Sequence, residues 1–271
     1  REPEEERLGQ PSARNIFGNV PTLDEILELP FTDPDDADLY VPIREDIAFH
    51  KGQRGRAIFV QTPGVFECGN SMIGLQQSLE ALALQPEKLK VFYERIARWA
   101  QRYVDNCLDL GCDVIHISDD WGMNQRLLFS PRTWWEIIYP AERLITEHAR
   151  RRGATVSLHS DGYIWDVMDG ILQLGIRCLH PVQESAGMDM LKVKQTYGHL
   201  LTLYGGLDVR TTLGRQPQDL PAVRDEIVRH MCQLKPGGGF IFCTSHIVME
   251  NTPLAEVEFA LEVANAYAPY R

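Results

Sequence analysis

Three features are missing from this sequence, and each absence excludes a class of protein. No apolar run reaches about 18 residues, so the sequence predicts no transmembrane helix. No stretch combines clustered Lys and Arg with aromatic residues, and the net charge of −11 opposes binding to nucleic acid or to an anionic membrane. None of the six cysteines belongs to a CxxC pair, which indicates a reducing, cytoplasmic location rather than a disulfide framework.

The N-terminal part of the sequence is hard to read as regular structure. The chain begins with Arg1 rather than Met, and its opening stretch, REPEEERLGQPS, is charged and polar. This stretch is neither a signal peptide nor a strand, and we expect the natural chain to begin earlier. We predict an irregular N-terminal segment over residues 1–56 and one folded domain over residues 57–271.

The remainder alternates short apolar runs with longer amphipathic ones. The short runs predict six strands, at residues 57–61, 113–117, 155–159, 176–180, 201–204 and 239–243. Apolar residues at helical spacing predict the main helices between them, at about residues 71–84, 86–110, 131–152, 220–234 and 254–267. The repeated order of strand and helix is typical of a parallel sheet whose strands are buried on both faces.

We therefore predict the α/β class and, within it, a single-domain (β/α)₈ TIM barrel that lacks part of its N-terminus. The length of 271 residues suits such a domain. A closed barrel needs eight strands and only six are predicted, so an open doubly wound sheet is the alternative. A missing N-terminal portion would supply the remaining strands.

Polar side chains follow nearly every predicted strand. In parallel α/β folds the loops after the strands carry the chemistry, because the carboxyl ends of the strands converge on one face. The residues that follow five of the strands are Ser118-Asp119-Asp120, His159-Ser160-Asp161, His180-Pro181-Val182-Gln183, Gly205-Gly206-Leu207-Asp208 and Cys243-Thr244-Ser245-His246. Five such ends in succession predict an active site.

A metal site is one interpretation of the third predicted strand end. His159 and Asp161 stand at positions i and i+2 of an extended segment, so both side chains point to the same side. With His246 from a neighbouring loop they would form a three-ligand set that leaves a position open for substrate, as in catalytic zinc sites. The alternative is structural, with Asp161 capping the following helix and His159 hydrogen-bonded locally.

The other strand ends offer acid–base and substrate-binding candidates. Asp119 and Asp120 are adjacent carboxylates, and if both face the site their repulsion raises one pKa. The alternative is that one of them caps a turn and the other is solvated. Gln183, Asp208 and His180 are candidates for contacts with substrate. On a predicted helix, Trp134 and Trp135 are core or interface residues and are compatible with a homodimer.

Several of these segments together resemble the uroporphyrinogen decarboxylase superfamily. The similar segments are, in order, DVIHISDDWGMNQRLLFSPRTWWEIIYP, LHSDGYI, HPVQ, LKVKQTYGHLLTLYGGLDV and GGGFIFCTSHIVMENTP. The resemblance covers about three quarters of the chain and implies a (β/α)₈ barrel. The superfamily contains true uroporphyrinogen decarboxylases and methyltransferases that work with corrinoid proteins.

The resemblance favours the methyltransferase branch. LHSDG aligns with the His-x-Cys of the zinc methyltransferases, and FIFCTSH aligns with their further Cys, so the family's ligands become His159, Asp161 and His246. It implies transfer of a methyl group between a small O-, N- or S-methyl substrate and cobalamin on a separate corrinoid protein. Zinc is the implied metal, although this harder ligand set also suits iron or manganese. Under this interpretation Asp119 or Asp120 donates a proton, and Gln183 and Asp208 position the substrate.

Two rival functions remain open. A decarboxylase of tetrapyrroles needs several cationic side chains and no metal, and the arginine motif RQAGR is not found in this sequence. A non-catalytic barrel that binds a small molecule is the third possibility. Unpaired polar groups clustered in a pocket are costly without a use, which argues against a purely structural role.

Overall fold

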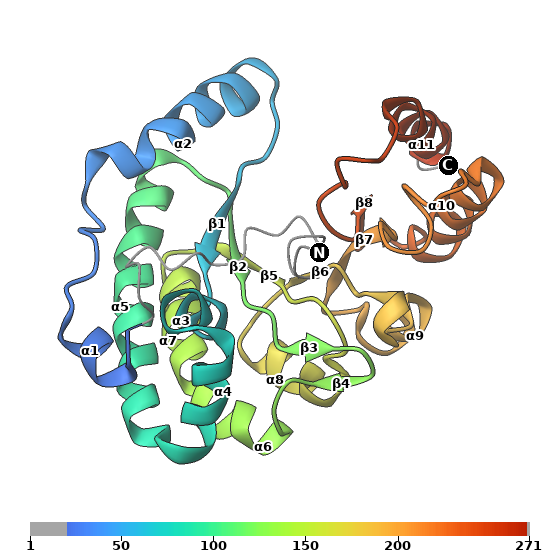
Figure 1. Ribbon diagram of the computed structural model, residues 1–271. Helices are drawn as coiled ribbons and strands as arrows, with labels where there is room; N and C mark the ends of the chain where they lie inside the picture. The colour runs from blue at the N-terminus through green and yellow to red at the C-terminus, as the bar shows by residue number, and fades with distance from the viewer. Residues whose placement is uncertain (1–20, 270–271) are drawn as a thin grey trace. The chain divides into compact units, whose positions relative to one another are not determined.

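The computed structural model describes residues 21–269, which form two compact units (Figure 1). Of these residues, the first unit contains 21–120, 129–158 and 167–176, and the second contains 121–128, 159–166 and 177–269. The strands of the main sheet follow the order β1-β2-β5-β6-β7-β8. In a doubly wound sheet later strands lie on both sides of the first, so this order excludes that alternative and confirms the barrel-type α/β fold.

All six predicted strands are present in the structure. In the first unit, β1 (Phe59–Pro63) pairs in parallel with β2 (Val114–Ser118), and β5 (Thr155–His159) runs up to the point where the second unit begins. In the second unit, β7 (Thr202–Leu207) pairs in parallel with both β6 (Cys178–His180) and β8 (Phe240–Thr244). A short antiparallel hairpin, which we did not predict, joins β3 (Gly122–Met123) to β4 (Arg126–Leu127).

The longest helix organises the first unit. Helix α5 (Pro86–Leu110) begins with a proline in its first turn and ends at Gly111, whose φ of 101° places it in the left-handed region. Its buried positions recur at helical spacing and include Leu89, Phe92 and Tyr93. Against it pack α3 (Val65–Ile73), α4 (Leu75–Leu84), the π-helical turn η4 (Trp134–Ile138) and α7 (Tyr139–Arg151). The short helices α6 (Pro131–Thr133), which leads into η4, and α8 (Met168–Gln173) belong to the same unit.

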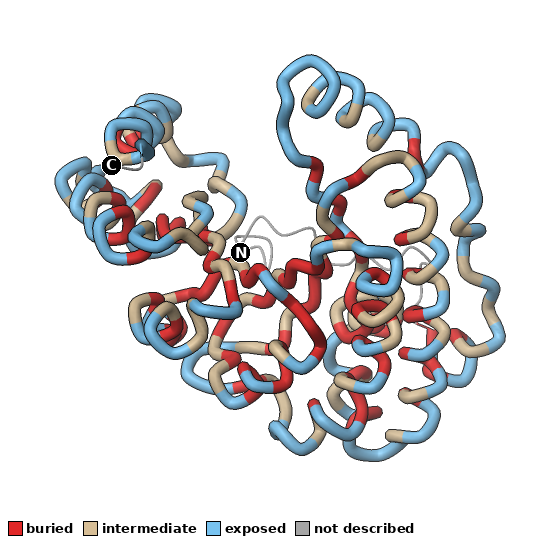
Figure 2. Tube along the Cα trace, turned by 180° about the vertical axis from the view of Figure 1, so that it is seen from behind, coloured by how far each residue is buried: buried red, intermediate tan, exposed pale blue. Residues whose placement is uncertain are grey.

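The second unit buries its own apolar cluster. Helices α10 (Leu220–Leu234) and α11 (Leu254–Tyr267) pack on each other and on the end of β7, with Leu207, Val223 and Ile227 at the centre. Helix α9 (Met190–Tyr197) and the 3-10 turns η5 (Trp165–Val167) and η6 (Glu184–Ala186) complete it. Figure 2 shows the buried positions, in red, along the strands and on the inner sides of the helices.

The prediction of an irregular N-terminal segment is wrong for residues 23–53, and residues 1–20 lie outside the described residues. Four short elements occupy this stretch, namely α1 (Leu23–Glu28), η2 (Ala37–Tyr40), α2 (Val41–Asp46) and the π-helical η3 (Ile47–Gln53). Each has at most 7 residues, too few to show a helical period in sequence. The local signal was a capping box at α1, in which Thr22 and Glu25 bond to each other's backbone. Among residues 21–269, no helix has the length and apolar character needed to cross a membrane.

Candidate functional site

The structure brings His159, Asp161 and His246 together. His159 is the last residue of β5, Asp161 follows two residues later, and His246 lies two residues beyond β8. Each offers one ligand atom, and these atoms lie within 4.8 Å of one another. His246 Nε2 lies 3.6 Å from Asp161 Oδ2. All three side chains belong to the second unit and are partly exposed.

This arrangement fits a small divalent metal ion. Ligands bound at about 2.0–2.1 Å in a tetrahedron lie about 3.3 Å apart, so the 3.6 Å pair needs only a small contraction. About a quarter of the His246 and Asp161 side chains is exposed, which leaves the cluster open to a further ligand. Two imidazoles and one carboxylate suit zinc, iron or manganese.

Two glycines fix the backbone that carries Asp161. Gly162 follows the aspartate at a φ of 82°, and a Cβ on it would come within 2.4 Å of the Gly122 carbonyl carbon. A Cβ on Gly122 would come within 2.4 Å of the Asp161 carbonyl oxygen. The segments around Gly122 and Gly162 can therefore cross this closely only because neither glycine has a side chain. Hydrogen bonds from Trp121 N to Ser160 Oγ at 3.1 Å and from Tyr163 N to the Met123 carbonyl at 2.9 Å hold the crossing on both sides.

His180, predicted to contact substrate, lies against His159. The Nδ1 atoms of the two rings are 2.6 Å apart, and the rings stack with centroids separated by 4.9 Å. The other ring nitrogen of His180, Nε2, lies 3.1 Å from the Thr244 carbonyl oxygen. Burial lowers the pKa of His180, with a smaller lowering from the nearby His246, so the neutral ring is favoured.

The backbone between His180 and Gln183 is strained. Val182 has a φ of 54°, which is a genuine outlier for a β-branched residue, and its side chain is buried. Strain of this kind persists only where the surrounding structure fixes it, and it concentrates at functional sites. One such constraint is the close approach of the Pro181 carbonyl oxygen, which would lie 2.5 Å from a Cβ on Gly205.

Gln183 and Asp208, the other predicted substrate contacts, are joined in a hydrogen-bonded chain. Gln183 Oε1 accepts from the Gly162 backbone N–H at 2.9 Å, and its Nε2 donates to Ser185 Oγ at 3.2 Å. Ser185 Oγ in turn donates to Asp208 Oδ2 at 2.7 Å. Both side chains are buried, and Gln183 supports the loop that carries Asp161. Their use in substrate binding stays a prediction.

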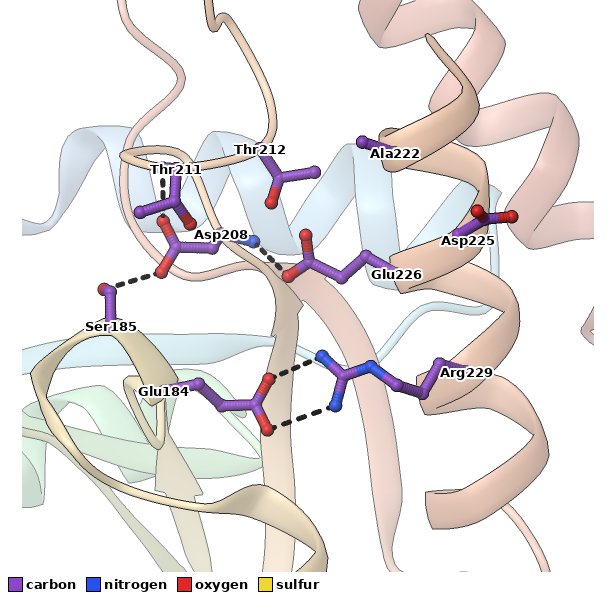
Figure 3. A pocket seen from close by; sticks show the side chains of 9 residues that line it. All are labelled: Glu184, Ser185, Asp208, Thr211, Thr212, Ala222, Asp225, Glu226 and Arg229. Carbon is purple, nitrogen blue, oxygen red and sulfur yellow. Dashed lines mark hydrogen bonds and ion pairs between the residues drawn. The ribbon is translucent and has the colours of Figure 1, made fainter. Parts of the chain in front are cut away.

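Asp208 also lines a cavity of about 440 Å³ in the second unit (Figure 3). Figure 3 shows Glu184 opposite Arg229, and the Glu226 carboxylate beside the backbone of Asp208. Glu184 accepts from Arg229 Nη2 at 2.7 Å and lies 3.0 Å from His230 Nε2. Although burial opposes its charge, these two partners lower the pKa of Glu184 to about 2. Glu184, Glu226 and His230 also lie within metal-ligand reach of one another, but the ion pair with Arg229 accounts for Glu184.

Asp119 caps the N-terminus of helix α3. This side chain is fully buried, and its oxygens accept from the backbone N–H groups of Phe66 at 3.2 Å and Glu67 at 2.5 Å in the first turn of α3. It is also hydrogen-bonded to the side chain of Glu142, and Glu142 Oε1 accepts from the backbone N–H of Val65 at 2.7 Å. Burial raises the pKa of Glu142 to about 7. A capping role was the alternative reading of Asp119, and the helix it caps is α3.

Asp120 is only half-buried, and its charge acts on a residue that sequence reasoning missed. Glu67 lies in the first turn of α3 and accepts from Ser118 Oγ at 2.9 Å. Burial raises the pKa of Glu67, and the Asp120 carboxylate raises it further. The raised pKa makes Glu67 a candidate general acid. The rule about strand ends would have found Glu67 had it been applied to β1.

Comparisons with known proteins agree on the family. The family described as uroporphyrinogen decarboxylase (URO-D) matches residues 56–267. A uroporphyrinogen decarboxylase from Chromohalobacter salexigens is 24% identical over 192 residues, or 68% of this chain. This chain covers 50% of that relative, so it spans about half the length of the curated protein it matches.

Two solved structures share the fold. A methyltransferase from Methanosarcina mazei superposes with a TM-score of 0.69 at 18% identity, over 86% of this chain and 67% of its own. A B12-independent methionine synthase from Shewanella sp. W3-18-1 superposes with a TM-score of 0.53 at 14% identity, over 83% of this chain and 65% of its own. At these identities the likeness concerns the fold.

Proposed function

The chain belongs to the uroporphyrinogen decarboxylase family, and we propose that it is a metal-dependent methyltransferase of that family. It would move a methyl group between a small O-, N- or S-methyl compound and cobalamin on a corrinoid protein. The observation that carries the proposal is the convergence of His159, Asp161 and His246, at positions similar to the zinc ligands of the family's methyltransferases. The methyltransferase structure from Methanosarcina mazei adds support at the level of the fold.

The proposed site contains metal ligands, a proton donor and residues that support the loops. His159, Asp161 and His246 would hold a divalent ion, zinc in the first instance, which supplies a Lewis acid for the poor leaving group of a methyl ether or amine. Asp120 would supply or accept the proton of the leaving group, and Glu67, whose pKa is raised by burial and by the Asp120 carboxylate, is a second candidate. Gln183 and Asp208 would stabilise the loops that face the substrate.

Metal binding is the first test. The purified chain is dialysed against Zn²⁺, Mn²⁺ or, without oxygen, Fe²⁺, and bound metal is measured by elemental analysis. We expect a single ion per chain in the wild type and its loss in His159→Ala and Asp161→Ala. His199→Ala, which removes an exposed histidine of the same unit, is the control and should retain the metal. A wild-type chain that stays free of metal after supplementation would end the proposal.

Methyl transfer is the second test. Free cob(I)alamin replaces the corrinoid protein, and its conversion to methylcobalamin is followed by absorbance with aryl methyl ethers, methylamines and methyl thioethers as donors. The reverse assay offers methylcobalamin and a thiol or phenol. Turnover that disappears in Asp161→Ala and persists in His199→Ala is the expected result.

A tetrapyrrole decarboxylase is the second candidate, because the curated relative carries that name. Decarboxylation of uroporphyrinogen in the presence of a chelator, unchanged by His159→Ala, would favour it over methyl transfer. The two sequence candidates for binding its carboxylates, Arg126 and Arg210, are both exposed. The non-catalytic alternative predicts no turnover in either assay.

A further inference from the structure

Three nitrogen atoms and one carbonyl oxygen form a chain behind the proposed metal site. From Thr244 O the chain passes 3.1 Å to Nε2 of His180, and from Nδ1 of His180 it passes 2.6 Å to Nδ1 of His159. Both imidazoles are only partly exposed, and their planes are inclined by 29°. The four atoms therefore define a continuous hydrogen-bonded path from strand β8 to the last residue of β5.

The carbonyl at one end decides where the protons lie. A carbonyl oxygen only accepts, so Nε2 of His180 must carry the hydrogen. In a neutral ring Nδ1 of His180 is then an acceptor, and Nδ1 of His159 must be the donor. The lone pair of His159 consequently lies on Nε2. A metal can bind an imidazole only through a nitrogen that carries a lone pair.

We infer that His180 is a positioning residue, which holds His159 in the Nδ1–H tautomer and thereby makes Nε2 of His159 the metal-ligating atom. Metal-bound histidines commonly donate their second N–H to a carboxylate, a carbonyl or water, and here a second imidazole takes that place. The inference deepens the proposed function and rests on its metal site.

The same strand end connects two of the proposed ligands. Thr244, whose carbonyl sets the tautomer of His180, is the last residue of β8, and His246 follows it by two residues. A displacement of this strand end would therefore change the position of His246 and the orientation of His159 together. The hydrogen-bonded path thus links His159 and His246, two proposed ligands that are 87 residues apart in sequence.

Nuclear magnetic resonance of the metal-free wild type tests the tautomers directly. Long-range ¹⁵N–¹H correlations distinguish a protonated ring nitrogen from one with a lone pair. We expect protonated Nδ1 and unprotonated Nε2 in His159, and the reverse in His180. A protonated Nε2 in His159 would overturn the inference, whether or not the protein binds metal.

Two substitutions of His180 separate acceptor chemistry from packing. His180→Gln retains a side-chain acceptor for His159, whereas His180→Phe retains a flat ring without one. We expect the Phe variant to lose the Nδ1–H tautomer and to bind Zn²⁺ roughly 10- to 100-fold more weakly, with the Gln variant closer to wild type. His199→Phe, an exposed position of the same unit, is the matched control.

The outcomes separate this inference from the function on which it rests. A changed tautomer in His180→Phe with unchanged Zn²⁺ affinity would overturn it while leaving the metal site in place. The predicted tautomers in a wild type that binds no metal would end the proposed function and support the orientation of His159. If His180→Phe does not fold, the wild-type spectrum and the His180→Gln titration still decide.

Discussion

Glu142 permits a prediction whose size follows from the structure. Its side chain is 1% exposed, and burial raises its pKa to about 7 from an ordinary value of 4.5. Burial outweighs the hydrogen bonds with Val65 and Asp119, which favour the charged form, so Glu142 keeps its proton below about pH 7. Glutamine has nearly the shape of a protonated glutamate and can also donate to Asp119. We therefore expect Glu142→Gln to fold normally.

The expected effect depends on pH with a defined sign. Below pH 4.5 both the folded and the unfolded chain keep Glu142 protonated, so variant and wild type should differ little. Between pH 4.5 and 7 only the unfolded chain loses the proton, and the wild type loses stability relative to the variant. Each unit of pKa difference corresponds to about 1.4 kcal/mol, so the advantage of Glu142→Gln should reach roughly 3 kcal/mol above pH 7.

Urea denaturation followed by circular dichroism at pH 4.5, 6 and 8 measures this advantage. Glu147→Gln on the same helix, whose side chain is 42% exposed, is the control and should give a small difference that does not vary with pH. A Glu142→Gln variant less stable than wild type at pH 8 would show that Glu142 is ionised in the folded protein. A difference that does not change with pH would lead to the same conclusion.

Three further predictions concern the cap on α3, the crossing at Gly122 and the ion pair between Glu184 and Arg229. Asp119→Ala removes the acceptor for two N–H groups at the start of α3, so it should cost about 1–2 kcal/mol in a thermal or urea unfolding assay. Gly122→Ala should lower the free energy of unfolding by at least about 1–3 kcal/mol and reduce metal binding, because its Cβ would meet the Asp161 carbonyl oxygen at 2.4 Å. Gly111→Ala is the control, which should lower stability and leave metal binding unchanged. Glu184→Gln should cost about 2 kcal/mol at pH 6 and progressively less as the pH falls from 4.5 toward 2, because the lowered pKa of Glu184 stabilises the fold only while the group is ionised; an unchanged cost at pH 2.5 would contradict this.

The fold was largely predictable because its signals are local. Buried parallel strands read as continuous apolar runs, and all six predicted runs form strands whose ends lie within three residues of the expected positions. Helix α5 was predictable from Pro86, Gly111 and the apolar period between them. The short elements before β1 have no such period, and the π-helical turn at η4 depends on packing around Trp134 that no local pattern encodes.

The candidate site was predictable only in part, because chain proximity depends on tertiary structure. The spacing of His159 and Asp161 indicated a shared side, and the resemblance added His246. The contact between His180 and His159 depends on how neighbouring strand ends are aligned, which a single sequence does not reveal. The capping of α3 by Asp119 likewise depends on a helix that begins at Val65, 54 residues before Asp119 in the sequence. The strand-end rule could not distinguish a possible ligand from a cap.

The ligand set itself argues for a particular kind of methyl donor. A divalent ion held by one imidazole and two thiolates is neutral overall, whereas one held by His159, His246 and Asp161 keeps a net positive charge. That charge favours a leaving group that develops negative charge on oxygen, and it is less well matched to activation of a soft thiol. The substitution of harder ligands for thiolates therefore makes aryl or alkyl methyl ethers the donors that the site should prefer. Greater turnover of methyl thioethers than of methyl ethers by the metal-loaded chain would contradict this reasoning.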